Sequence, residues 1–175
     1  MKKCLIVVDF QKDFVDGALG FPDAEKLEKK ILQKLDSALA DKYDILFTLD
    51  THGGDYLQTQ EGRCLPTPHC LRDSNGWTLY GQIETYLPIA KAVFEKNTFG
   101  SLDLAGFLKA QQYDEVELVG LVSNICVLSN AVLAKAALPE AEIFVDASCT
   151  ASFNKSLHQK ALDILEGIYI KVINR

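Results

Sequence analysis

Two patterns of hydrophobic residues alternate along the whole chain. Short apolar runs rich in β-branched residues, such as CLIVV at residues 4–8, are typical of buried parallel strands. Longer segments place an apolar residue at every fourth position, as Leu27, Ile31, Leu35 and Leu39 do, and this spacing predicts an amphipathic helix. The predicted strands are residues 4–9, 43–50, 92–95, 115–120, 142–146 and 168–173. The predicted helices are residues 23–40, 79–87, 101–111, 124–138 and 154–166.

The alternation of strand and helix predicts an α/β fold. Parallel strands joined through helices form right-handed crossovers, so we expect a mostly parallel sheet covered on both faces. No repeat, linker or low-complexity segment interrupts the pattern, and we predict a single domain over residues 1–175. Residues 51–78 fit neither pattern and are predicted to form a long loop, which inside a compact domain is usually functional.

Four chemically useful residues lie at or just after the ends of predicted strands. Asp9, Asp50 and Lys96 end or follow the first three strands, and Cys126 follows the fourth. In open α/β sheets, ligands bind outside the carboxyl ends of the strands. We therefore expect these four side chains to converge at one edge of the sheet.

Composition and charge narrow the range of partners. The net charge is −6 and no basic run occurs, so a nucleic-acid partner is not expected. No apolar run approaches the roughly 20 residues of a membrane-spanning helix, so no membrane partner is expected. The five cysteines are irregularly spaced and indicate no disulfide framework. We expect a cytoplasmic protein that acts on a small molecule, and self-association as a homo-oligomer is left open.

Cys126 is the candidate nucleophile. It lies in the first turn of a predicted helix, after a tight turn that follows a strand. The free N–H groups and the positive dipole at a helix N-terminus favour a thiolate and can lower the pKa of a cysteine. The same N–H groups can hold a developing oxyanion. A buried cysteine with only a packing role is the alternative.

Asp9 is the candidate base, because no histidine is well placed for that role. A carboxylate beside a thiol can take its proton when burial and neighbours bring the two pKa values together. Lys96 would then keep Asp9 ionised and stabilise the thiolate. His158 lies on an amphipathic helix, where a surface or packing role is expected, so a Cys–His hydrolase is not favoured. A turn cap for Asp9 and a solvated side chain for Lys96 are the alternatives.

Candidate metal ligands cluster after the second predicted strand. Asp50 and His52 are two residues apart in an extended stretch, so their side chains can bind one ion. His69 can complete a set of three ligands, and Glu61 is a weaker fourth candidate that acts directly or through water. Carboxylate and imidazole suit Zn²⁺, our first choice, or Fe²⁺ or Mn²⁺. Three protein ligands would leave positions open for water or substrate.

Two other interpretations of this segment are open. Cys64 and Cys70 could form a thiolate zinc site with His69, although their spacing matches no standard zinc finger. The polar residues could also simply be those of an exposed loop.

Five motifs are spread in order along nearly the whole chain. They are LIVVDFQKDF at residues 5–14, TLDTH at 48–52, PTPHC at 66–70, FEKNTFGS at 94–101 and GLVSNICV at 120–127. Together they resemble the isochorismatase-like cysteine hydrolases, specifically the nicotinamidase/pyrazinamidase branch. The resemblance implies a three-layer α/β/α sandwich with a mostly parallel, Rossmann-like sheet of about six strands.

The resemblance also implies an activity and a catalytic triad. Asp9, Lys96 and Cys126 would release ammonia from a small carboxamide, nicotinamide first and pyrazinamide as well, through a thioester on Cys126. The family has a non-proline cis peptide bond that falls here between Leu121 and Val122. The backbone N–H groups of Val122 and Cys126 would form the oxyanion hole.

A divalent metal ion and an aromatic pocket complete the implied site. The implied metal ligands are Asp50, His52 and His69, with Glu61 in the place of a further ligand. The residues expected to pack against the substrate ring are Phe14, Leu19, Trp77 and Phe99, for which ordinary core packing is the alternative.

The sequence departs from the family pattern at two places near the triad. Ser123-Asn124 stand where nicotinamidases commonly have Thr-Asp, and Asn97-Thr98-Phe99 stand where they often have Tyr-Ser. These departures leave the triad intact and bear on the choice of substrate. A hydrolase of the same fold acting on another small amide is therefore one alternative, and a non-enzymatic ligand-binding protein on a decayed scaffold is another.

Overall fold

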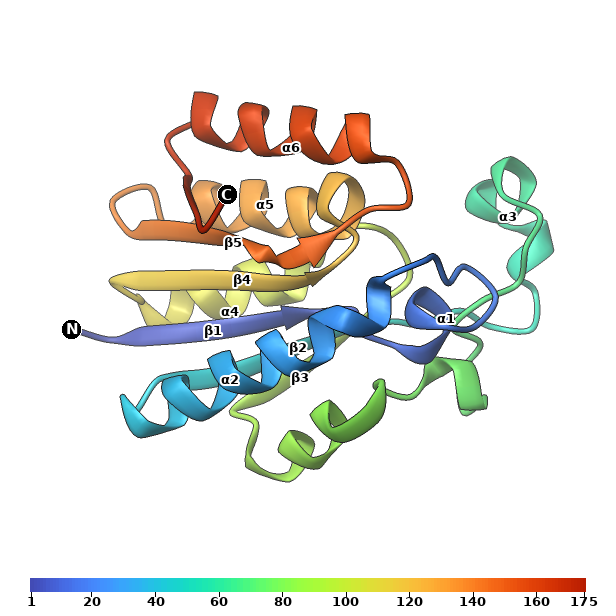
Figure 1. The fold of residues 1–175 in the computed structure, drawn as a ribbon, viewed down its shortest axis with the longest axis horizontal. Helices are drawn as coiled ribbons and strands as arrows, with labels where there is room; N and C mark the ends of the chain where they lie inside the picture. Colours follow the sequence, from blue (N-terminus) through green and yellow to red (C-terminus); the bar gives the residue numbers. More distant parts are fainter.

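Six parallel strands form one continuous sheet in the computed structural model, which describes all of residues 1–175 (Figure 1). The order of strands across the sheet is β3-β2-β1-β4-β5-β6. The strands are β1 (Lys3–Val8), β2 (Asp44–Asp50), β3 (Ala92–Lys96), β4 (Glu115–Leu121), β5 (Glu142–Ala151) and β6 (Lys171–Ile173). The central strands β1 and β2 are buried along almost their whole length, which explains their continuous apolar runs.

Helices on both faces of the sheet enclose two hydrophobic cores. On one face, α2 (Leu27–Ala40) and a 3-10 helix (Gly81–Ile89) cover a core of 18 buried residues. On the other face, α4 (Leu102–Gln111), α5 (Leu128–Ala137) and α6 (Lys155–Gly167) cover a core of 19 buried residues. The predicted α/β/α sandwich with its six-stranded parallel sheet is confirmed. None of the helices combines the length and the apolar character that crossing a membrane would require.

Two short α-helices were not predicted. They are α1 (Lys12–Val15), directly after β1, and α3 (Gln60–Cys64), inside the segment predicted to be a loop. The hydroxyl of Thr59 caps α3 by accepting the N–H of Gly62 at 3.0 Å. Helices this short carry too few residues to show a hydrophobic period, so the sequence pattern could not reveal them.

The last two strands differ from their predicted boundaries. β5 continues to Ala151, because its pairing with β4 shifts register between Leu118 and Gly120 and then resumes. β6 begins only at Lys171, and the residues before it complete the end of α6.

The order of the strands creates a crevice between β1 and β4. From β1 the chain passes outward to β2 and β3, and it then returns to form β4 on the opposite side of β1. The crevice outside the carboxyl ends at such a switch point is the usual ligand site of open α/β sheets. The residues that follow β1 and β4 therefore face each other across the expected position of a ligand.

Gly120 allows β4 to approach β1 closely beside this crevice. Its φ angle is +112°, and a Cβ atom at this position would lie 2.1 Å from the carbonyl oxygen of Val8. Only glycine satisfies both the dihedral angle and the close approach. Because Asp9 directly follows Val8, and Cys126 belongs to the turn after β4, this contact helps to set the distance between Asp9 and Cys126.

Replacing Gly120 with alanine is expected to lower the free energy of unfolding by about 2–4 kcal/mol, because the strained φ angle alone costs about 1–3 kcal/mol and the Cβ displaces β1. Urea denaturation measures this change. Gly106→Ala is the matched control: Gly106 lies in α4 with open space around a Cβ, so its replacement should stabilise the protein by about 0.5–1 kcal/mol. Equal stability of Gly120→Ala and wild type would show that this position does not require glycine.

A partly buried ion-pair network joins α2 to the sheet. Lys34 Nζ lies 2.7 Å from Glu117 Oε1 and 2.8 Å from Asp146 Oδ2. Asp146 is fully buried, and it also accepts hydrogen bonds from Ser148 and from Asn174. Burial by itself would raise the pKa of Asp146, but the Lys34 ammonium and these hydrogen bonds outweigh it and lower the pKa.

The Asp146→Asn variant tests this network through the pH dependence of stability. A carboxyl whose pKa is lowered by folding stabilises the protein above its unfolded pKa of about 3.9, and the contribution is lost as the pH falls. The variant should be about 1–3 kcal/mol less stable at pH 7 and should lose less stability than wild type between about pH 5 and pH 2. Unfolding free energies measured across this range, with the exposed Asp103→Asn as control, decide the matter. Parallel curves for Asp146→Asn and wild type would refute it.

Candidate active site

A turn directly after β1 directs the Asp9 carboxylate into the crevice. Asp9 has a φ angle of +44°, which non-glycine residues rarely adopt outside functional sites. Its side chain is fully buried, and the hydroxyl of Thr48 on β2 donates to Oδ1 at 2.6 Å. Lys96 Nζ lies 2.6 Å from Oδ2. One neutral donor and one cation therefore hold the carboxylate.

The ammonium group of Lys96 is the centre of the site. Lys96 ends β3 beside Asp50, the last residue of β2. Its Nζ lies 3.3 Å from Asp50 Oδ1 and 3.6 Å from Cys126 Sγ, and it donates to the carbonyl oxygen of Thr98 at 2.9 Å. With the Asp9 contact, one buried cation joins all four residues that strand ends were expected to bring together.

A π-helical turn, Ser123–Val127, holds Cys126 between β4 and α5. Such turns are rare and often mark functional sites. The peptide bond between Leu121 and Val122 is cis, as the resemblance implied. Asn130 on α5 donates to the carbonyl oxygen of Cys126 at 2.8 Å and so fixes the turn to the helix that follows it.

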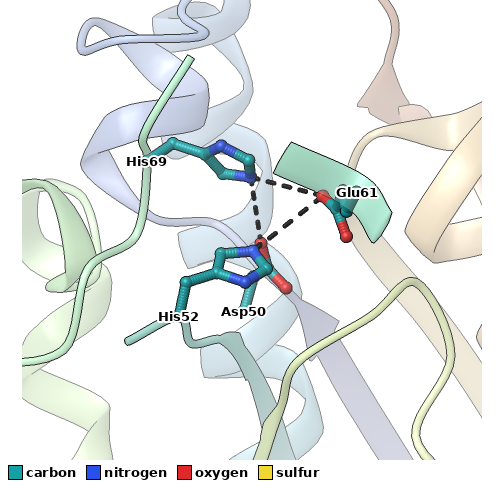
Figure 2. A group of neighbouring side chains, drawn as sticks. All are labelled: Asp50, His52, Glu61 and His69. Carbon is teal, nitrogen blue, oxygen red and sulfur yellow. Dashed lines mark hydrogen bonds and ion pairs between the residues drawn. The ribbon is translucent and has the colours of Figure 1, made fainter. Parts of the chain in front are cut away.

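Two histidines and two carboxylates converge beside Lys96 (Figure 2). Asp50 and His52 come from the end of β2 and the residues after it, His69 from the long connection, and Glu61 from α3 on the other side. Asp50 Oδ2 lies 2.9 Å from His52 Nε2 and 3.3 Å from His69 Nε2. Glu61 Oε1 lies 3.7 Å from His69 Nε2 and 3.9 Å from His52 Nε2. The segment predicted to be a loop thus closes onto the strand end.

The chemistry of this group fits a divalent metal ion. Ligand atoms of a tetrahedral zinc site lie about 3.4 Å apart, because zinc–nitrogen and zinc–oxygen distances are about 2.1 Å. The four carboxylate–imidazole distances, 2.9–3.9 Å, lie on both sides of this value, and all the ligand atoms lie within 4.8 Å of one another. His69 Nδ1 donates to the carbonyl oxygen of Thr67 at 2.9 Å, which leaves the lone pair of Nε2 facing the group. Cys64 is exposed and Cys70 is not part of the group, so the thiolate alternative finds no support.

Comparison with known proteins agrees with this geometry. A model of the isochorismatase domain matches residues 3–175. The chain belongs to the isochorismatase family.

Among solved structures, the nicotinamidase/pyrazinamidase of Bacillus subtilis is 31% identical to this family member, covers 98% of this chain and 99% of its own, and has a TM-score of 0.87. The nicotinamidase/pyrazinamidase of Mycobacterium tuberculosis is 27% identical over 145 residues, which are 74% of this chain and 76% of that protein. The pyrazinamidase of Pyrococcus horikoshii, solved in complex with zinc, is 23% identical over the whole of both chains and has the same fold with a TM-score of 0.86. The predicted family and its amidohydrolase class are confirmed, which leaves the non-enzymatic alternative without support.

An apolar cavity of about 400 Å³ opens over Cys126 and the metal-binding group. Phe14, Leu19 and Phe99, three of the four residues expected to contact a substrate ring, line it. Trp77 does not. Its indole N–H donates to the hydroxyl of Thr51 at 2.8 Å, so Trp77 holds the residue that lies between Asp50 and His52 in the sequence.

Two polar residues that position the site were missed by sequence reasoning. The side-chain amide of Gln11 donates to the carbonyl oxygen of Asp50 at 2.9 Å and accepts the N–H of Asp50 at 2.8 Å. Asp13 accepts the backbone N–H of Cys70 at 2.7 Å and so holds the residue next to His69. Both lie in the motif LIVVDFQKDF, and their place directly after Asp9 was the available signal.

The pKa of Cys126 differs from the expectation of a lowered value. Burial raises the pKa of this thiol well above its usual value, the Asp9 carboxylate raises it further, and Lys96 only partly opposes them. Burial likewise raises the pKa of Asp9 against the opposing effect of Lys96. For Lys96, burial would lower the pKa, but Asp9, Cys126 and Asp50 raise it, so the ammonium stays charged. The helix N-terminus alone does not produce a resting thiolate.

His158 has the packing role expected of it. It is half-buried on α6, and its Nδ1 lies 2.8 Å from the hydroxyl oxygen of Ser123, at the start of the π-helical turn.

Gln11→Ala should weaken zinc binding by about 10–100-fold, the usual effect of removing a residue that orients a metal ligand. The reason is that Asp50 would lose both backbone hydrogen bonds to the Gln11 side chain. Competition with a chromophoric chelator measures the dissociation constant. Gln82→Ala is the matched control, since the side chain of Gln82 is exposed and far along the sequence from the group. Equal zinc affinity for Gln11→Ala and wild type would show that the two hydrogen bonds from the Gln11 side chain do not position Asp50.

Proposed function

We propose that the protein hydrolyses a small aromatic carboxamide, nicotinamide first and pyrazinamide as well, to the acid and ammonia through a thioester on Cys126. The observation that carries this proposal is the set of contacts of one ammonium group. Lys96 Nζ lies within 3.6 Å of Asp9, Asp50 and the sulfur of Cys126, and the last two of these residues line an apolar cavity. The likeness to nicotinamidases supports the same substrate class.

In the first step, Cys126 attacks the carboxamide carbon while its proton passes to Asp9. Burial raises the pKa of Asp9, which makes its carboxylate a better proton acceptor, and Lys96 opposes the raised pKa of the thiol by stabilising negative charge on the sulfur. The negative charge moves from the carboxylate to the sulfur and onward to the substrate oxygen. Lys96 lies beside both the carboxylate and the sulfur, so the negative charge stays next to this cation. The number of buried charges therefore does not change during the transfer.

The tetrahedral oxyanion that results would be held by the backbone N–H groups of Val122 and Cys126. The N–H of Val122 has no hydrogen-bond partner within the protein and is free to donate. Loss of one such donor typically costs about 10²–10³ in rate.

Collapse of the tetrahedral species breaks the carbon–nitrogen bond. The leaving nitrogen takes the proton from Asp9 and departs as ammonia, and the acyl group stays on Cys126 as a thioester. A water molecule then gives its proton to Asp9, attacks the thioester carbon and releases the acid. The sulfur finally recovers the proton from Asp9, so the enzyme returns to its starting state.

Asp50, His52, Glu61 and His69 would hold a divalent ion, Zn²⁺ first, with Fe²⁺ or Mn²⁺ as alternatives. When bound, such an ion supplies a Lewis acid to which a pyridine or pyrazine nitrogen can bind, which orients the ring. The zinc in the Pyrococcus pyrazinamidase supports this choice. Phe14, Leu19 and Phe99 would enclose the ring from the sides of the cavity. The single domain over residues 1–175 and the cytoplasmic location remain predictions.

Cys126→Ala should abolish ammonia release from nicotinamide, with a loss of at least about 10³-fold, because no other group can form the thioester. A coupled ammonia assay measures turnover, and mass spectrometry of quenched wild-type enzyme should detect the acyl adduct on Cys126. Cys64→Ala is the matched control: this cysteine is exposed on α3 and should leave the rate unchanged. Turnover near the wild-type rate in a folded Cys126→Ala protein would end the nucleophile assignment.

A panel of amides tests the substrate separately from the mechanism. If pyridine and pyrazine carboxamides are not hydrolysed while another small amide is, the triad assignment stands and the substrate assignment is wrong.

A further inference from the structure

We propose that Phe153, together with Phe99 and Leu65, forms an outer apolar subsite that makes the enzyme prefer aromatic carboxamides with an apolar substituent on the ring. This inference rests on the proposed function, because it takes the carboxamide carbon to lie at Cys126. Phe99 would contact both the ring and the substituent, whereas Leu65 and Phe153 belong to the part of the cavity that an unsubstituted ring does not need.

The three residues come from three separate parts of the chain and line one cavity. Leu65 follows α3, Phe99 follows β3, and Phe153 lies between β5 and α6. Each is substantially exposed: 38% for Leu65, 46% for Phe99 and 62% for Phe153. The cavity extends from the buried Cys126 to these exposed side chains, so they form its outer end.

None of the three contributes to either hydrophobic core. Leu65, Phe99 and Phe153 are absent both from the buried core residues and from the partly buried residues that pack against them. The nearest aromatic partner of Phe153 is Phe21, whose ring centre lies 6.4 Å away in an edge-to-face arrangement. Stability of the fold therefore does not explain why large apolar groups from three segments meet around one opening, whereas contact with a ligand does.

The volume of the cavity gives room for more than one ring. Its volume of about 400 Å³ lies within the range of roughly 300–1,000 Å³ found for pockets that hold drug-sized ligands. The charged groups that line it, Asp50 and Glu61, belong to the metal-binding group at the inner end. The outer end therefore offers only apolar contacts, and it should accept alkyl or aryl groups and reject charged ones.

Ring chemistry identifies the position of the substituent. In nicotinamide, ring position 2 lies between the ring nitrogen and the carbon that carries the amide. With the amide at Cys126 and the nitrogen toward the group around Asp50, position 2 faces inward between them. Position 5 is opposite and points away from both, toward the outer end of the cavity.

Binding measurements on the metal-loaded Cys126→Ala protein test the subsite without turnover. The probes are nicotinamide, 5-propylnicotinamide and 5-(carboxymethyl)nicotinamide, titrated by calorimetry. The propyl compound should bind about tenfold tighter than nicotinamide, the lower end of the effect of added methylene groups in an apolar pocket, and the charged compound should bind more weakly than nicotinamide. In wild-type enzyme, the same order should hold for kcat/KM.

Variants at Phe153 assign the effect to this residue. Phe153→Ala in the Cys126→Ala background should reduce the ratio of the propyl to the nicotinamide affinity about fivefold or more, and Phe153→Leu should retain most of it. Ile164→Ala is the matched control, since Ile164 is 53% exposed on α6 and does not line the cavity.

The possible results separate the inference from the function on which it rests. If nicotinamide binds and is hydrolysed but the propyl compound binds no tighter, or if Phe153→Ala leaves the ratio unchanged, the subsite is refuted and the proposed function stands. If nicotinamide is neither bound nor hydrolysed, the proposed function fails and the inference fails with it.

Discussion

A single buried cation, the ammonium of Lys96, is the interaction on which the site depends. Two carboxylates, Asp9 and Asp50, and the sulfur of Cys126 lie within 3.6 Å of it, in a region from which solvent is almost excluded. Without this cation, Asp9 would be an isolated buried charge, which would take up a proton and could not serve as the base that we propose it to be. Burial and charge thus explain together why proton transfer between sulfur and carboxylate is feasible although burial raises the pKa of both groups.

The same cation links the two halves of the site. Asp50 contacts Lys96 through Oδ1 and both histidines through Oδ2, so one carboxylate belongs to the surroundings of the proposed triad and to the candidate metal-binding group. The backbone of Asp50 is fixed in turn by Gln11, two residues after Asp9. A change at either half is therefore transmitted to the other through short, directional contacts. These contacts join residues at the ends of β1, β2 and β3, so they depend on the register of the three strands.

The sequence predicted the parts of the site that regular strands carry. Asp9, Asp50 and Lys96 could be assigned because a buried strand leaves a clear apolar run, and the residue that ends the run lies at a known edge of a parallel sheet. Parts that depend on irregular backbone were not predictable in this way. The short helix α3, which carries Glu61, shows no hydrophobic period.

Side-chain roles that depend on packing were harder still to predict. Trp77 was expected in the cavity as an aromatic residue. It does not line the cavity, and its indole N–H donates to the hydroxyl of Thr51 instead. Phe153 was not singled out, because its sequence context does not show that its loop ends at the cavity opening. The pKa of Cys126 was expected to be lowered by the helix N-terminus, but burial raises it well above its usual value and Asp9 raises it further.

The difference between the charged inner end and the apolar outer end of the cavity bears on how the proposed thioester can be hydrolysed. The inner end is charged and buried, and this favours transfer of a proton between groups that are already in contact. Hydrolysis of the thioester, however, needs a water molecule beside Asp9, which is fully buried. In the proposed mechanism, departure of ammonia would free a position of similar size and polarity next to the same carboxylate, and water could take it while the acyl group still covers Cys126. The group proposed to accept the proton from the thiol would then also activate the water, so one carboxylate held by Lys96 would be sufficient for both halves of the reaction.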